Sequence, residues 1–206
     1  MGNLVWYARS VFPPMAAGRT GFGTRFWVVL LASIIGFTFA LSGAAIAAGS
    51  GKAHRVKAAF VLNFAALTEW PSESFGDSMD PIVICHVGSS QTNSLLDSAY
   101  SGRMVELRSI DFRHLTSLER ISGCHIVFIT AEQGEQSREL ITAVAGRSIL
   151  TIGETEGFAR SGGVIGFYNH ESKIRFEINL GAAERARLRF SSRLLQLARL
   201  VSNEGE

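Results

Sequence analysis

The chain has 206 residues, of which 47% are hydrophobic and 18% are charged. All 18 acidic residues but only 17 of the 20 basic residues follow residue 47, so the formal charge falls from +2 to −1 beyond that point. The composition excludes a disordered chain, and the charge excludes a basic nucleic-acid binder, so we expect no nucleic-acid partner.

The first 47 residues are typical of a secretory leader. Arg19 and Arg25 precede an uncharged apolar run at residues 26–48, and small residues at 45–47 suit a signal peptidase. We therefore predict a signal peptide at residues 1–47, cleaved near Ala47, and one periplasmic domain at residues 48–206. A retained membrane anchor is the alternative, because about 20 apolar residues can span a bilayer.

The first part of the predicted domain alternates helical and strand patterns. Apolar residues at helical spacing predict a helix over residues 52–70, which Pro71 terminates. A β-branched run predicts a strand at residues 81–87, and a polar turn at residues 88–93 leads into a helix around residues 95–99.

The same alternation continues to the C-terminus. We predict strands at residues 104–110, 125–129 and 148–152, helices at 115–121 and 135–145, a hairpin at 164–178, and a long final helix at 181–201. Because parallel strands need crossover connections, these elements predict an α/β fold: a single domain with a mainly parallel sheet, helices on both faces, and an antiparallel hairpin near the C-terminus.

Cys85 and Cys124 are the two cysteines of the chain. An even pair in an exported protein favours one disulfide, since an oxidising compartment preserves such bonds. The alternative is a pair of small buried hydrophobic side chains.

Candidate ligand-binding residues are few. Arg185, Arg189 and Arg193 recur every four residues in the predicted final helix, where a row of guanidinium groups can hold a carboxylate or phosphate. A solvated helix face is the simpler interpretation. Glu177 lies between apolar neighbours, and we expect it to face solvent on an edge strand unless it has a buried partner. The turn at residues 88–93 is a further candidate, because α/β sheets bind ligands beyond the carboxyl ends of their strands.

Motifs for catalysis or metal binding are missing. The sequence has no phosphate-binding loop, no zinc-protease motif and no serine-hydrolase motif, so we expect no enzyme activity, no catalytic residues and no cofactor. The repeated Cys-His dipeptides, at Cys85 and Cys124, contain residue types that bind zinc. Adjacent residues of a strand point to opposite faces, however, so we expect no metal site.

Four stretches resemble the YfiR family of periplasmic regulators. They are residues 56–64 with Glu69-Trp70-Pro71, residues 82–85 before Gly88, residues 157–159 with Gly162-Gly163, and residues 173–180 with Ala182-Ala183 and residues 191–195. The resemblance covers about residues 54–201.

The resemblance implies a non-enzymatic exported domain that forms a homodimer and restrains an inner-membrane diguanylate cyclase through its periplasmic sensor region. It also implies relief of that restraint by an OmpA-like outer-membrane lipoprotein, and a disulfide between Cys85 and Cys124. A fold does not fix a function, so a periplasmic small-ligand-binding module that serves another membrane sensor is the alternative.

Overall fold

The computed structural model describes residues 51–203, and residues 51–66 of this range are helical. The helix ends at Ala66, earlier than the predicted end at Trp70. The hydroxyl of Thr68 donates a hydrogen bond to the carbonyl of Phe64 (2.6 Å), which satisfies a carbonyl of the last helical turn. The chain then forms β1 (Thr68–Glu69), which pairs with β9 (Arg189–Phe190).

The main sheet has eight strands in the order β10-β8-β7-β6-β5-β2-β4-β3. The strands are β2 (Ile82–Val87), β3 (Met104–Val105), β4 (Arg108–His114), β5 (Ile126–Ile129), β6 (Leu150–Gly153), β7 (Ile165–His170), β8 (Lys173–Asn179) and β10 (Arg199–Val201). Pairing is parallel from β4 through β7 and between β8 and β10, and antiparallel in the hairpins β7–β8 and β3–β4. The predicted fold class is confirmed.

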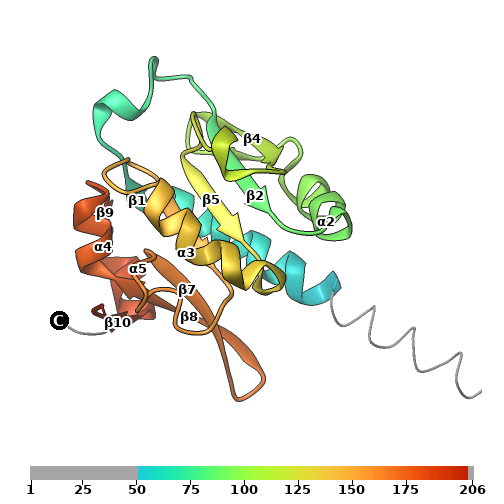
Figure 1. Ribbon diagram of the computed structural model, residues 1–206. Helices are drawn as coiled ribbons and strands as arrows, with labels where there is room; N and C mark the ends of the chain where they lie inside the picture. Colours follow the sequence, from blue (N-terminus) through green and yellow to red (C-terminus); the bar gives the residue numbers. More distant parts are fainter. Residues whose placement is uncertain (1–50, 204–206) are drawn as a thin grey trace, which may run out of the picture. The chain divides into compact units, whose positions relative to one another are not determined.

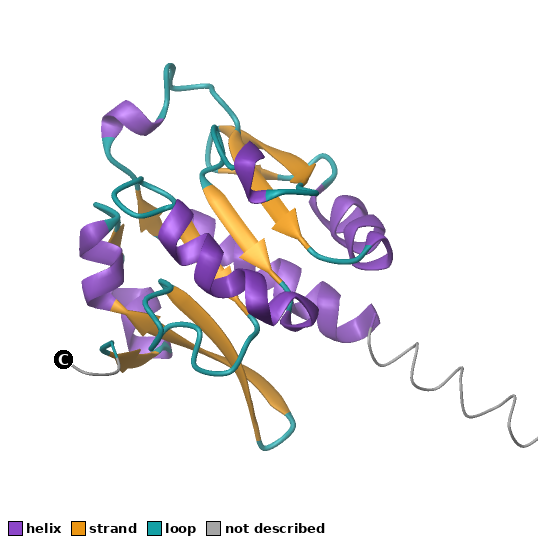
Figure 2. Ribbon diagram, viewed as in Figure 1, coloured by secondary structure: helices purple, strands orange, loops and turns teal. Residues whose placement is uncertain are grey.

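Helices cover both faces of this sheet (Figure 1). The N-terminal helix and α2 (Ser90–Tyr100) contribute Phe64 and Leu96 to one buried cluster, whereas α3 (Gly134–Ala143) contributes Leu140 to the other. Every residue of β2 is buried, as expected for a strand covered on both sides. The β7–β8 hairpin projects beyond the neighbouring strands (Figure 2).

The segment after α2 differs from its prediction. The predicted strand at residues 104–110 is the hairpin β3–β4, which turns at Glu106 with a φ of 53°. The predicted helix at residues 115–121 contains only the 3-10 turn η2 (Leu118–Arg120). Its first residue belongs to the sheet region, because the amide of Leu115 donates to the carbonyl of His86 (2.9 Å).

The predicted final helix at residues 181–201 is wrong. Instead α4 (Leu180–Arg185), β9, α5 (Ser192–Leu197) and β10 follow one another. The helix α4 ends because Arg187 adopts a φ of 56° and the amide of Leu188 returns to the carbonyl of Ala183 (2.9 Å). Ser191 then caps α5 through its side-chain oxygen.

The predicted leader lies outside the described residues and stays a prediction. Within residues 51–203, no helix combines the length and apolar character that crossing a bilayer requires.

Candidate functional site

A charged cleft of about 750 Å³ lies beyond the carboxyl ends of β5 and β6. This edge of a parallel sheet is where α/β folds place ligands, because strand ends and loops leave a crevice there. The N-terminal helix, the loop after β6, the β7–β8 hairpin and β10 form the walls. The charged lining residues are Lys57, Glu154, Glu156, Arg160, Glu177 and Arg199.

Glu177 is buried in the wall of this cleft, with 3% of its surface exposed. It does not lie on an edge strand, because β10 pairs alongside β8 and places Arg199 directly beside it. The guanidinium of Arg199 donates two hydrogen bonds to Glu177 Oε2, of 3.1 and 2.5 Å. The same guanidinium lies 3.9 Å from the centre of the Tyr168 ring. The expectation that Glu177 faces solvent is therefore wrong, and the buried carboxylate is paired with the half-exposed Arg199.

Lys57 and Glu154 form a second ion pair in the cleft, with 2.8 Å between Lys57 Nζ and Glu154 Oε2. Only 9% of the Glu154 side chain is exposed. The other carboxylate oxygen, Oε1, is buried and has no hydrogen-bond partner within the described part of the chain. Because an unsatisfied buried acceptor is costly, this oxygen favours a hydrogen-bond donor inside the cleft.

The three arginines predicted to form one row lie on three different elements. Arg185 ends α4, Arg189 lies in β9 and Arg193 lies in α5. Arg185 donates a hydrogen bond to Asn203 Oδ1 (3.3 Å). Because the helix is interrupted between them, the predicted row on one helix face does not form.

The predicted ligand turn at residues 88–93 serves the start of α2. Ser89 is the N-cap residue, and its side chain accepts a hydrogen bond from the amide of Thr92. The Nδ1 atom of His86 lies 2.5 Å from Asn93 Oδ1, so this nitrogen carries the proton in the neutral ring. The polar residues of the turn thus cap the helix and position a buried histidine.

Burial lowers the pKa of His86 to about 4, although its hydrogen bond to Asn93 acts in the opposite direction. His114, opposite His86 on β4, and His54 lower the pKa further. The unfolded chain therefore takes up a proton near pH 6.5, before the folded protein does. The contribution of neutral His86 to the free energy of unfolding is therefore present above pH 6.5 and is lost as the pH falls from 6.5 toward 4.

We expect the free energy of unfolding to fall by about 2 kcal/mol more between pH 7 and pH 5 in the wild type than in His86→Gln. Urea unfolding at the two pH values measures this difference. His170→Gln, at the exposed end of the β7–β8 hairpin, is the control and should behave like the wild type. An equal loss in the wild type and His86→Gln would show that His86 does not cause the pH dependence.

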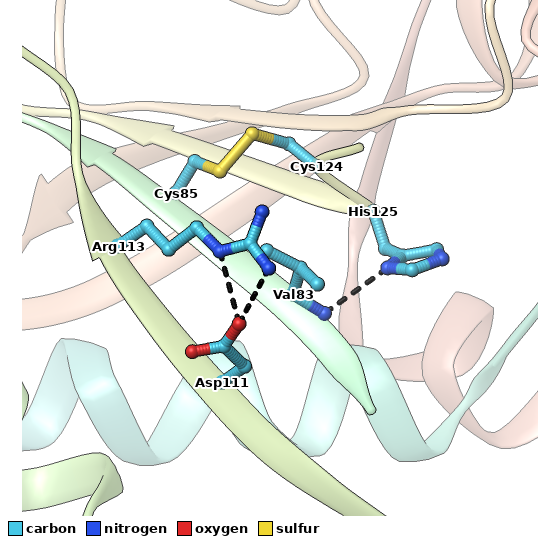
Figure 3. Close-up of polar contacts among 6 residues, drawn as sticks. All are labelled: Val83, Cys85, Asp111, Arg113, Cys124 and His125. Carbon is cyan, nitrogen blue, oxygen red and sulfur yellow. Dashed lines mark hydrogen bonds and ion pairs between the residues drawn. A yellow bond between two sulfur atoms is a disulfide. The ribbon is translucent and has the colours of Figure 1, made fainter. Parts of the chain in front are cut away.

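A disulfide joins Cys85, in the middle of β2, to Cys124, just before β5 (Figure 3). The two Cα atoms lie 5.9 Å apart, and both residues belong to the core cluster under α3. His125 turns away from the bridge: its Nδ1 accepts a hydrogen bond from the Val83 amide (3.0 Å), and its Nε2 donates to the Ser74 carbonyl (2.9 Å). Burial lowers the pKa of His125.

The metal-ligating residue types are not gathered into a site in the part of the chain that the structure describes. No group of three or more His, Cys, Asp or Glu side chains there is placed to hold an ion. The sulfur atoms of Cys85 and Cys124 are bonded to each other, and His86 points toward Asn93.

Sequence patterns did not indicate the roles of Lys57, Glu154 and Arg199. Glu154 nevertheless lies two residues after the predicted strand at residues 148–152, at the edge of the sheet where α/β folds bind ligands, so its position could have marked it as a candidate. Lys57 and Arg199 carried no such signal, since the positions of both depend on how the N-terminal helix and β10 pack.

Comparison with known proteins gives one family match. A family model described as YfiR/HmsC-like matches residues 54–199. No protein of curated function matches the sequence.

Two solved structures are similar over part of the chain. One is an ABC domain in complex with L-Trp from Streptococcus pneumonia, with 9% identity and a TM-score of 0.46 over 58% of this chain and 55% of that chain. The other is a conserved domain protein from Vibrio cholerae, with 10% identity and a TM-score of 0.44 over 58% of this chain and 54% of that chain. The chain thus spans just over half the length of each structure.

Proposed function

Because the chain belongs to the YfiR/HmsC-like family, we propose that it is a non-enzymatic periplasmic regulator that lowers cyclic-di-GMP by restraining an inner-membrane diguanylate cyclase. The family match over residues 54–199 carries this proposal, since the family suggests periplasmic regulation of cyclic-di-GMP signalling. The disulfide also supports it, because such bonds persist in an oxidising compartment. The proposal includes a homodimer and sequestration by an OmpA-like outer-membrane lipoprotein.

The β10 edge of the sheet suits the proposed contact with the cyclase sensor region. β10 is the last strand in the sheet order, so one side of its backbone has no neighbouring strand within residues 51–203. Leu197 and Leu200, in α5 and β10, expose 66% and 50% of their surface. An open strand edge with apolar side chains favours a protein partner, because the partner buries the leucines and can pair with the backbone.

Deletion of the gene is expected to raise cellular cyclic-di-GMP several-fold, because the restrained cyclase becomes active. Complementation with the full-length chain should restore the low level, whereas a chain without residues 1–47 should not, because it stays in the cytoplasm. Cyclic-di-GMP is measured in cell extracts by mass spectrometry. An unchanged level on deletion, with the cyclase shown to be expressed, would contradict the proposal.

The same assay tests the β10 edge. Leu200→Arg should lose most of the restraint at an unchanged protein level, since a charge at the contact disfavours burial. Met79→Arg is the matched control, because Met79 is also an exposed apolar residue (65%) but lies in the turn that precedes β2, outside the β10 edge. If Leu200→Arg still restrains the cyclase fully, the β10 edge is not the contact with the cyclase. If Leu200→Arg instead loses self-association, the edge binds a second copy of this chain.

A ligand-binding module is the second candidate function. It is favoured by Oε1 of Glu154, which has no hydrogen-bond partner among the residues that the structure describes. A small ligand with an amine would supply the missing donor in the cleft. We expect a saturating concentration of 1,4-diaminobutane to raise the melting temperature by about 4 °C in the wild type and not in Glu154→Gln. Glu184→Gln, exposed on α4 outside the cleft, should respond like the wild type. An equal rise of the melting temperature in both variants would indicate that the diamine acts by general charge screening, and would exclude the cleft as its binding site.

A further inference from the structure

Arg199 belongs to two features of the molecule at once. Its side chain lines the charged cleft, and its backbone lies in β10, the strand that carries the exposed Leu200. Both of its hydrogen bonds to Glu177 end on one oxygen, Oε2, and its side chain is 49% exposed. A change at this guanidinium inside the cleft therefore reaches the β10 edge directly.

The attachment of β10 to the sheet depends strongly on polar contacts. No residue of β10 is buried, and Leu194 is the one buried residue of α5, the helix that leads into it. Arg199 holds the start of the strand, and Asn203 holds its end through Oδ1, which accepts a hydrogen bond from Asn179 (2.8 Å). An element with few buried apolar contacts is among the first to open. Loss of the Arg199 contact should thus unpair β10 before the rest of the sheet.

The place that Arg199 occupies in the cleft suits any guanidinium group. Glu177 is 3% exposed, so its carboxylate needs a cation beside it. The Tyr168 ring, whose centre lies 3.9 Å from Cζ of Arg199, adds an aromatic face that attracts cations. A free guanidinium ion meets the same two groups. Because no backbone restrains it, it can also contact both carboxylate oxygens of Glu177, and so it can compete with Arg199.

A second anchor for a cation lies in the same cleft. Oε1 of Glu154 is buried and has no hydrogen-bond partner within residues 51–203, although Lys57 holds the other oxygen. An ammonium group carries only donors, which is what this oxygen lacks. The cleft thus offers one enclosed carboxylate to an ammonium group and another, Glu177, to a guanidinium group.

We propose that an aminoalkylguanidine, a small molecule with an amine at one end and a guanidinium group at the other, binds in the charged cleft and displaces Arg199 from Glu177. β10 then separates from β8, and the contact surface that carries Leu200 is lost. This inference rests on the ligand-binding role proposed above for the cleft, and adds to it the class of ligand and its effect. In the cell such a ligand lifts the restraint on the cyclase, because the β10 edge is the proposed contact.

Hydrogen exchange in the presence of agmatine, which is 1-amino-4-guanidinobutane, tests the displacement. Its matched control is 1,4-diaminobutane, which has an amine at both ends. Exchange of the purified protein is followed by mass spectrometry at constant ionic strength. We expect saturating agmatine to speed the exchange of residues 198–203 about tenfold and to leave β2 and β5 unchanged, because only β10 opens. Diaminobutane should not speed this exchange, because it has no guanidinium group to replace that of Arg199.

Melting temperatures of the same samples show which proposal fails if the expected exchange is not seen. If agmatine raises the melting temperature but leaves the exchange of β10 unchanged, it binds without displacing Arg199. The inference is then overturned, and the ligand-binding role stands. If neither compound raises the melting temperature, the cleft does not bind these cations and both proposals fail. Equal acceleration by the two compounds would also overturn the inference, since the guanidinium group would not be the cause.

Arg199→Lys tests the competition itself. Lysine keeps the charge but not the planar fork, so it should hold Glu177 less well, and the agmatine concentration for half-maximal exchange should fall about fivefold. Arg193→Lys, at an exposed position on α5, is the control and should keep the wild-type concentration. A concentration that is unchanged in Arg199→Lys would overturn the inference, because agmatine would not compete with this side chain. Fast exchange of β10 in Arg199→Lys without ligand would support the role of Arg199 in holding the strand, and the wild-type exchange then decides on the ligand.

Discussion

Replacing Cys85 with serine is expected to lower the melting temperature of the purified domain by about 10 °C in oxidising buffer. The bridge joins positions that are 39 residues apart in sequence. In the chain-entropy model, a loop of this length restricts the unfolded chain by about 4 kcal/mol. For a domain of this size, each kcal/mol shifts the melting temperature by roughly 2–4 °C.

The reduced wild type is the main control for this prediction. Loss of the bridge is the shared cause, so reduced wild type, Cys85→Ser and Cys124→Ser should melt within about 3 °C of one another. Ser122→Ala, which lies in the same loop and keeps the bridge, should melt like the oxidised wild type. An oxidised wild type that melts with the reduced protein would show that the bridge adds no net stability. A serine variant that melts far below the reduced protein would show that the buried serine hydroxyl, and not only the loss of the bridge, destabilises the domain.

The central strands could be predicted because their signal is local. Residues 82–87 and 126–129 are β-branched or aromatic runs between turn residues, and the sheet buries both faces of each run. The β7–β8 hairpin could be predicted equally well, because two apolar segments flank a short polar turn.

The C-terminal segment could not be predicted in the same way. Ala183, Ala186, Phe190 and Leu194 recur at helical spacing, but they reach the core from α4, a turn, β9 and α5 in succession. Their period thus reflects burial in one cluster and not a continuous helix. The left-handed conformation at Arg187 breaks the helix, and arginine gives no sequence signal for that conformation.

The charged cleft depends on contacts between distant segments. The burial of Glu177 follows from β10 pairing beside β8, and strand order is not encoded in local periodicity. The Lys57–Glu154 pair likewise joins the N-terminal helix to the loop after β6. The residue types were visible in the sequence, but their proximity required the tertiary structure.

The Gly157–Gly163 segment, which carries part of the family resemblance, has a packing explanation. Phe158 is buried between two glycines, Gly153 at the end of β6 and Gly163 before β7. A Cβ atom at either glycine would overlap ring atoms of Phe158. The amide of Gly163 also donates to the carbonyl of Phe158 (3.0 Å), which closes the turn around the ring. The ring and the two glycines therefore fit only as a set.

Gly163→Ala is accordingly expected to destabilise the domain by about 3 kcal/mol, because an added methyl group must displace a buried ring in a closed turn. Urea unfolding at pH 7 measures the change. Gly134→Ala in α3 is the matched control: its new Cβ would meet only Thr155 at 3.8 Å, and alanine favours a helix, so it should leave stability unchanged or raise it by up to about 1 kcal/mol.

A double-mutant cycle separates overlap with the ring from other effects at Gly163. Phe158→Ala alone should cost about 4 kcal/mol, since it empties a buried aromatic site. If overlap with the ring causes the loss, Gly163→Ala should cost less than about 1 kcal/mol in the Phe158→Ala background. A cost that stays near 3 kcal/mol in that background would instead place the strain in the backbone of the turn, where Gly162 adopts a φ of 105°.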